Sequence, residues 1–298
     1  MSADNAHPSA ADFIRVWVEG VGIVAPGLND WAQAIAVLRG EQAYSAAPTV
    51  LPAPEVLPPA ERRRASRIVK VTLAAGLQAC RMAGREPASL PNVFASSGGD
   101  GHNCHALCEQ LASGDVQISP TRFHNSVHNA ASGYWSIATG ATPAAQVLGA
   151  YDASLGAGLL EAMAQVESAQ TPLLLVAGDS EYPAPLHAKR PIIDTSALAL
   201  VLAPTRSPHA LAELRLPRRH ALADGVPTAL ADVLMRPEDA LASAALGMPP
   251  LRGLPLLAAL LAPAGSVASV DVAFLPPQVL RLSVVALAPA AHAAASPA

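Results

Sequence analysis

The sequence predicts an α/β fold in which helices cover both faces of one sheet. Three observations support this prediction. Predicted strands and helices alternate through residues 13–205. Several strand segments, such as 173–177 and 198–202, are continuously apolar, which is typical of strands buried on both faces. The chain has 298 residues, of which 51% are hydrophobic and 14% are charged, so it can bury a large core.

The first part of the chain supplies the regular alternation. β-branched or continuous apolar residues predict strands at 13–24, 92–97, 146–149, 173–177 and 198–202. Helical patterns predict helices at 31–38 behind a cap at Asn29, at 67–83, at 102–112, within 123–139 and at 154–169. The Pro-rich residues 46–60 are predicted to form a loop.

The pattern weakens after residue 205. Helices are expected near 227–236 and 255–261, and two late strands at 269–274 and 279–286. Residues 1–12 read as a disordered tail, and residues 13–298 as a single domain. No internal repeat is visible.

Composition and charge exclude several classes of protein. The net charge of −4 argues against nucleic-acid binding. The start of the chain has no secretory signal pattern, and no apolar run is long enough to span a membrane. Three cysteines do not make a disulfide framework. We therefore expect a cytoplasmic protein without a membrane span.

One basic cluster stands out, formed by Arg62, Arg63, Arg64 and Arg67. A solvated helix face is the simpler interpretation. The alternative is that these four arginines dock an acidic carrier protein.

Metal and nucleotide sites are not expected. Residues 102–108 contain two histidines and two cysteines, but ligands at matching spacing are missing, so buried cysteines in a core helix are favoured over zinc. His124 and His128 lie four residues apart, and we favour an interface or buried helix over a metal there. The glycine-rich residues 96–101 match no phosphate-binding pattern and indicate a tight turn.

Residues 148–161 have the strand, sharp turn and helix that present a nucleophile. The corner residue is Tyr151, whose hydroxyl is a poor nucleophile near neutral pH. Ser154 is the alternative nucleophile. A serine elbow needs glycine two residues before and after the serine, and here those residues are Asp152 and Gly156. The possible triad partners are scattered and occupy no readable motif: His187, His209, His220, Asp194 and Asp224.

Six segments occur in the order found in β-ketoacyl-acyl-carrier-protein synthases, and each resembles its counterpart there. They are the opening strand and turn at 16–26, the long early helix at 62–81, the strand and glycine turn at 93–99, the interface helix at 125–140, the nucleophile strand, turn and helix at 146–161, and the strand and turn at 174–181. The resemblance implies a thiolase-like layered fold with a complete first half. Residues 206–298, about ninety in number, would be an abbreviated second half.

The departures from that family bear on activity. The family's nucleophile is a cysteine in an Ala-Cys-Ser-Ser sequence, and Tyr151 follows Ala150 at that position. Two histidine motifs of the active synthases have no counterpart after residue 205. The resemblance therefore implies a homologue without ketosynthase catalysis of its own and without a cofactor.

The chain most resembles the short, chain-length-factor-like ketosynthase homologues of aryl-polyene (xanthomonadin-type) pigment clusters, which share the run at 157–162. This resemblance implies a partner of an active ketosynthase that limits acyl chain length. The heterodimer would form through residues 122–140 and the strand at 146–149. Candidates for the interface or tunnel lining are Phe123, His128, Asn129, Tyr134 and Trp135, with core packing as the alternative. Two other functions stay open: a serine acyl hydrolase or acyltransferase centred on Ser154, and a homodimeric scaffold without acyl chemistry.

Overall fold

The computed structural model describes residues 12–219, 221–236 and 239–288. Within this part of the chain, nine strands form one sheet in the order β3-β2-β4-β5-β1-β6-β9-β7, and β8 pairs with β9. The strands are β1 (Phe13–Val24), β2 (Asn92–Ala95), β3 (Ala145–Leu148), β4 (Leu173–Asp179), β5 (Ser196–Ala203), β6 (Ala212–Pro217), β7 (Leu222–Asp224), β8 (Val267–Ala273) and β9 (Gln278–Ala286). The predicted tail at 1–12 lies outside the described residues except for Asp12.

The sheet is mixed. β2 pairs in parallel with β3 and β4, and the remaining strand pairs are antiparallel. Every residue of β4 and β5 is buried, which confirms the interpretation of their continuous apolar runs. The strands after residue 205 extend the same sheet beyond β1 rather than forming a second one.

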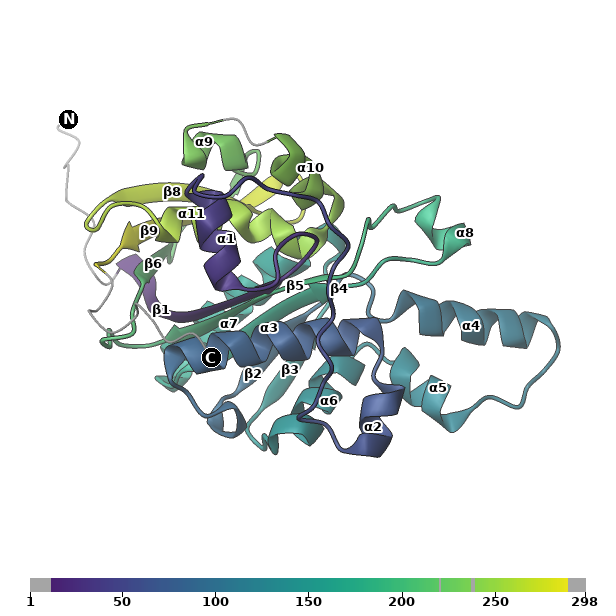
Figure 1. Cartoon of the computed structure of the whole chain (residues 1–298). Coiled ribbons are helices and arrows are strands. Elements are labelled where there is room, and N and C mark those ends of the chain that lie inside the picture. The colour runs from purple at the N-terminus through teal and green to yellow at the C-terminus, as the bar shows by residue number, and fades with distance from the viewer. Residues whose placement is uncertain (1–11, 220, 237–238, 289–298) are drawn as a thin grey trace.

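Helices cover both faces of the sheet, as predicted (Figure 1). Strand side chains alternate between two apolar clusters, one on each face. One cluster includes α3 (Arg67–Ala83) and α6 (Ala130–Thr139). The other includes α1 (Trp31–Leu38), α7 (Ser154–Ala169), α9 (Leu230–Leu234), α10 (Asp239–Gly247) and α11 (Leu254–Leu260).

Two helices stand apart from these layers. α4 (Gly101–Ala112) and α5 (Pro120–Ser126) project away from the end of the sheet (Figure 1). The prediction that Cys104 and Cys108 are buried in a core helix is wrong, because this projection leaves both thiols exposed and free. Only Cys80, on α3, is buried.

Local details also correct the sequence-based expectations. Asp30, not Asn29, caps α1, because its carboxylate accepts a hydrogen bond from Gln33 N at 2.8 Å. The predicted loop at 46–60 ends in a short helix, α2 (Pro59–Arg64), which holds three of the four clustered arginines. The helical segment at 123–139 is two helices, α5 and α6, because the chain becomes extended at Val127. β6, β7, α8 (Ala184–His187) and α10 were not predicted.

None of the helices in the described part of the chain combines the length and apolar character that a membrane crossing requires.

Candidate functional site

The predicted elbow exists between β3 and α7. The chain leaves β3 at Leu148, passes through a short 3-10 turn at Tyr151–Ala153, and enters α7 at Ser154. Tyr151 sits at the corner with a φ of 54°, a left-handed conformation that costs a bulky residue about 1–2 kcal/mol. Its side chain is 60% exposed. The strained backbone of a nucleophile elbow is therefore present, but it carries a phenol.

Ser154 closes the elbow from inside. Its hydroxyl donates to the carbonyl of Tyr151 at 2.7 Å and accepts from the backbone N–H of Ala150 at 3.0 Å. The residue is buried, and no histidine in the described part of the chain forms a hydrogen bond with it. This serine stabilises the turn and lacks the neighbouring base that a serine nucleophile needs.

Gly156, which suggested a serine elbow, is required for packing. A Cβ at this position would lie 2.2 Å from the carbonyl oxygen of Ala273 in β8. The glycine lets α7 approach β8 closely, so its presence does not favour a hydrolase.

Two arginines meet beside the elbow. The guanidinium of Arg190 stacks over the Tyr151 ring with its Cζ 3.9 Å from the ring centroid. The same guanidinium bonds one carboxylate oxygen of Asp152, and Arg252 Nη2 bonds the other oxygen at 3.0 Å. Burial lowers the pKa of Arg190, but the hydrogen bond and charge of Asp152 outweigh burial, so the guanidinium stays charged. Arg190 therefore covers one face of the Tyr151 ring.

A buried carboxylate lies behind Arg190. Arg190 Nη1 donates to Ser97 Oγ at 3.0 Å, and Ser97 donates both its hydroxyl and its N–H to Asp179 Oδ1. Asp179 ends β4 and is almost completely buried. Burial raises the pKa of the Asp179 carboxyl to about 6, while the bonds from Ser97 and Ser96 and the charge of Arg190 limit the rise.

The glycine-rich turn after β2 makes room for an aromatic ring. A Cβ at Gly98 would lie 2.0 Å from the Tyr182 hydroxyl oxygen, and one at Gly101 would lie 2.5 Å from Tyr182 Cδ1. The Tyr182 hydroxyl in turn accepts from Arg190 Nη1 at 3.0 Å. Packing against the Tyr182 ring therefore explains the glycines of this turn without a bound phosphate, in agreement with the tight structural turn predicted from the sequence.

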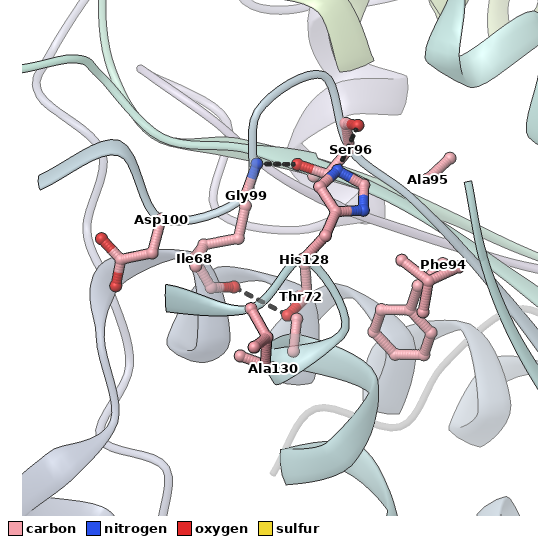
Figure 2. Close-up of a pocket in the computed structure, with 13 residues that line it drawn as sticks. Ile68, Thr72, Phe94, Ala95, Ser96, Gly99, Asp100, His128 and Ala130 are labelled. Carbon is pink, nitrogen blue, oxygen red and sulfur yellow. Dashed lines mark hydrogen bonds between the residues drawn. The ribbon is translucent and has the colours of Figure 1, made fainter. Parts of the chain in front are cut away.

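The space on the other side of the elbow is nearly filled. Figure 2 shows His128 beside Ser96 and Gly99, with Phe94 and Thr72 lining the same small cavity. His128 Nε2 lies 3.0 Å from the Ser96 carbonyl, which can only accept, so Nε2 carries the hydrogen. The cavity volume is about 10 Å³, room for about one water. No acyl chain fits there in this conformation.

The five predicted interface residues divide into two groups. Tyr134 and Trp135 are completely buried, Trp135 against Phe94 and α3, so core packing describes them in this chain. Phe123, His128 and Asn129 are exposed. Their role at an interface stays a prediction.

The four clustered arginines also differ from one another. Arg67 bonds Glu181 at 2.6 Å and Asp194 at 3.0 Å, in a network that joins α3 to the start of β5. Arg62 bonds the backbone carbonyls of Glu55 and Leu57. Arg63 and Arg64 are exposed, and Arg64 pairs only with Glu61 among the described residues. These two are the solvent-exposed positive charges of the cluster.

Sequence reasoning missed Arg190, Arg252 and Asp179. An acidic residue at the end of a continuous apolar strand was a readable signal for Asp179. The two arginines lie in segments without periodicity, and only folding brings them to Asp152, which is 38 residues from Arg190 and 100 from Arg252.

The comparisons with known proteins agree with this geometry. The model for the N-terminal domain of β-ketoacyl synthases matches residues 31–232. No curated protein sequence matches the chain.

Solved structures match most of the chain at low identity. The complex of a ketosynthase (ApeO) with its chain length factor (ApeC) from Xenorhabdus doucetiae contains a chain with 20% identity and a TM-score of 0.64, over 91% of this chain and 98% of that chain. The AntDE:AntF complex, a type II polyketide synthase carrier protein with its ketosynthase, contains a chain with 13% sequence identity and a TM-score of 0.63, over 92% of this chain and 99% of that chain. The ishigamide ketosynthase/chain length factor has 17% sequence identity and a TM-score of 0.54, over 70% of this chain and 65% of that chain.

These similarities establish the fold. They confirm the predicted thiolase-like architecture of the ketosynthases over most of the chain. The coverage values also mean that the matched chain of the Xenorhabdus complex is similar in length to this one. Because the family model spans more than half of the sequence, the chain belongs to the β-ketoacyl synthase family.

Proposed function

We propose that this protein is a non-catalytic β-ketoacyl synthase homologue that acts as the chain-length-factor-like partner of an active ketosynthase. The observation that carries the proposal is Tyr151 at the corner of an otherwise intact elbow. The pathway we propose is cytoplasmic acyl-chain biosynthesis of the aryl-polyene or polyketide type.

The chemistry at the elbow supports a loss of catalysis. Acyl transfer by a covalent route needs a nucleophile with an activating base or a depressed pKa. Tyr151 has a cation, Arg190, over its ring. His128 lies against Gly149, but its ring nitrogen pairs with the Ser96 carbonyl, and no histidine in the described residues hydrogen-bonds Ser154. The Tyr151 side chain instead stands at the corner, with Arg190 over one face of its ring. Bulk in this position suits a protein that limits chain length.

The surface around β3 supports a partner. β3 lies at the edge of the sheet and pairs only with β2 among the described strands, which leaves backbone groups free for another chain. Beside it, the helices α4 to α6 and the loop between α4 and α5 expose large apolar side chains: Leu111, Val116, Phe123, Val127 and Ile137. Exposed large apolar side chains near an open strand edge are typical of a subunit interface.

The solved relatives make a ketosynthase the best choice of partner. Two of them are complexes of a ketosynthase with a chain length factor, and another contains a ketosynthase with a carrier protein. We propose that Arg63 and Arg64, with Arg62, attract the acidic carrier protein to the assembled pair.

Co-expression with the cognate ketosynthase tests the proposal. We expect a stable one-to-one complex in size-exclusion chromatography. Ile137→Glu should weaken it by more than tenfold, because a charge would be buried at the interface. The matched control is Val267→Glu in β8, since Val267 is 64% exposed and Ile137 45%, and Val267 lies far along the sheet from β3. A well-behaved monomer that never binds the ketosynthase contradicts the proposal, and a stable homodimer alone supports the scaffold alternative.

A second experiment addresses catalysis directly. Incubation with an activated acyl thioester should leave the intact mass of the chain unchanged. Tyr151→Cys should restore at most slow acylation and no condensation with a malonyl thioester, because the family's histidine motifs are missing. Acylation of the wild type that disappears in Ser154→Ala would instead establish the acyltransferase or hydrolase alternative.

A further inference from the structure

A second pocket opens beside the elbow, between the loop before α9 and the exposed side of α10. Its volume is about 370 Å³, within the range of small-molecule sites. Its walls are almost entirely apolar, with Pro227, Leu230, Ala245 and Leu246 among the lining residues. Arg252 is the sole charged side chain that lines it among the described residues.

This pocket adjoins the one that contains Tyr151. The elbow pocket has a volume of about 330 Å³, and it shares Pro227, Arg252 and Ala273 with the α9–α10 pocket. The two pockets adjoin at these shared residues, and together we call them the α10 trough. It lies on the face of the sheet that α7 and α11 cover, and none of its lining residues belongs to the partner surface at α4 to α6.

Arg252 brings a positive charge to the place where the two pockets adjoin. Arg252 Nη2 bonds Asp152 Oδ2 at 3.0 Å and the carbonyl of Leu246 at 3.3 Å, so its guanidinium stands between both pockets. Arg190 neutralises the other oxygen of Asp152. Two guanidiniums therefore share one carboxylate, and an anion placed at Arg252 gains a charge-assisted hydrogen bond.

The apolar end of the α10 trough is wet in the free protein. Leu246 is 72% exposed and Val226 is 82% exposed, although both line the pocket. An apolar chain lying between them would remove this surface from water. A ligand that fits the whole trough therefore has an apolar tail and one negative head.

We propose that the α10 trough binds a single-chain amphiphile with a carboxylate head, a fatty acid or a similar long-chain acid. The tail lies against Leu230, Ala245 and Leu246, and the carboxylate pairs with Arg252. The inference goes beyond the proposed function, because it concerns this chain alone and needs no ketosynthase.

Isothermal titration with dodecanoate, below its micelle concentration, tests the binding on the isolated chain. We expect saturable binding of one dodecanoate per chain. Arg252→Gln should weaken dodecanoate binding about tenfold or more, because a hydrogen bond to a charged group is lost. The neutral analogue dodecanol lacks the head charge, so its affinity should differ less than about twofold between wild type and Arg252→Gln.

Variants at the apolar end test where the tail lies. Leu246→Glu should weaken dodecanoate binding about tenfold, whereas Leu246→Lys should not, and an exposed position tolerates both changes. Ala245→Trp should abolish binding of both probes by filling the pocket. Ala164→Trp, on the exposed side of α7, is the size-matched control and should bind like wild type.

Absence of saturable dodecanoate binding by the wild type overturns the proposal. Binding that survives both Arg252→Gln and Leu246→Glu unchanged places the ligand elsewhere and also overturns it. Either result leaves the ketosynthase complex unaffected, and a chain that binds dodecanoate but no ketosynthase would fail only the proposed function.

Discussion

The elbow and the α4–α6 surface lie at the same end of the sheet but differ in how their side chains are used. At the elbow, Asp152 and Asp179 are bonded by arginine and serine side chains, and Arg190 covers Tyr151. On the α4–α6 surface, large apolar side chains such as Phe123 and Ile137 are exposed to solvent. The charged groups of the elbow are paired within the chain, and we call this the closed region. The apolar side chains of the α4–α6 surface are exposed, and we call it the open surface.

This difference shows that the backbone conformation of the elbow and the side chains it carries have to be considered separately. The left-handed corner, the hydrogen bonds of Ser154 and the close packing at Gly156 maintain a strained strand-turn-helix corner with Tyr151 at its tip. The open surface has kept apolar side chains that cost solubility unless something covers them. A protein selected for assembly rather than for acyl transfer would show this combination.

The largest expected effect lies on the inner side of α6. Trp135→Ala should lower the free energy of unfolding by about 3–5 kcal/mol, because a completely buried ring leaves a cavity against α3. Ile137→Ala, on the outer side of the same helix, should change it by less than about 0.5 kcal/mol. Urea unfolding of the isolated chain measures both. Equal effects at the two positions would remove the distinction between the core side and the partner side.

A pH dependence should mark the closed region. The pKa of Asp179 is raised to about 6 in the folded chain, so between pH 4 and 6 the folded state holds a proton that the unfolded state has released. The free energy of unfolding contributed by this group therefore falls as pH rises through that window, by a total on the order of 3 kcal/mol. Asp179→Asn lacks this titrating carboxyl group, so this contribution to the pH dependence is absent from the variant.

Urea unfolding at several pH values compares the two proteins. The free energy of unfolding of the wild type minus that of Asp179→Asn should be largest near pH 4. Above pH 6 this difference should be smaller by on the order of 3 kcal/mol. A difference that is constant with pH would show that the carboxylate is better solvated than its burial indicates.

Removing the cation over Tyr151 should have a moderate effect. Arg190→Met breaks the bonds to Asp152, Ser97 and Tyr182 together, and we expect a loss of about 1–3 kcal/mol in unfolding free energy. Lys189→Met is the adjacent, exposed control and should stay within about 0.5 kcal/mol of wild type. If complex formation with the ketosynthase fails in Arg190→Met but not in the control, the closed region also contributes to assembly.

The smallest effect concerns Ser154. Ser154→Ala leaves the backbone N–H of Ala150 without its acceptor and should cost about 1 kcal/mol in thermal or urea unfolding. Binding to the ketosynthase should persist, since the hydroxyl faces the inside of the turn. A large loss of an enzymatic activity with normal stability would be the opposite result and would make the elbow a catalytic one.

The strands and the longer helices up to residue 205 were readable because they rest on local patterns, whereas the short helices α2 and α8 were missed. β4 and β5 are continuously apolar, and α7 has helix-forming residues after a sharp turn, so each prediction needed only its own segment. The later part was harder to predict. β6 and β7 are short and mixed in character, and they are strands because β1 and β9 offer them hydrogen-bonding edges.

The candidate site divides in the same way. The sequence by itself placed Tyr151 at the corner between a strand and a helix, and the structure has it there. Folding determined that Trp135 is core, that Cys104 and Cys108 are exposed, and that Arg190 and Arg252 meet at Asp152. The physical reason is the sequence separation over which each effect acts. Backbone preference and apolar periodicity act between residues that are neighbours in sequence. Ion pairs, burial and pocket walls depend on side chains that approach only when the sheet and its helices have assembled.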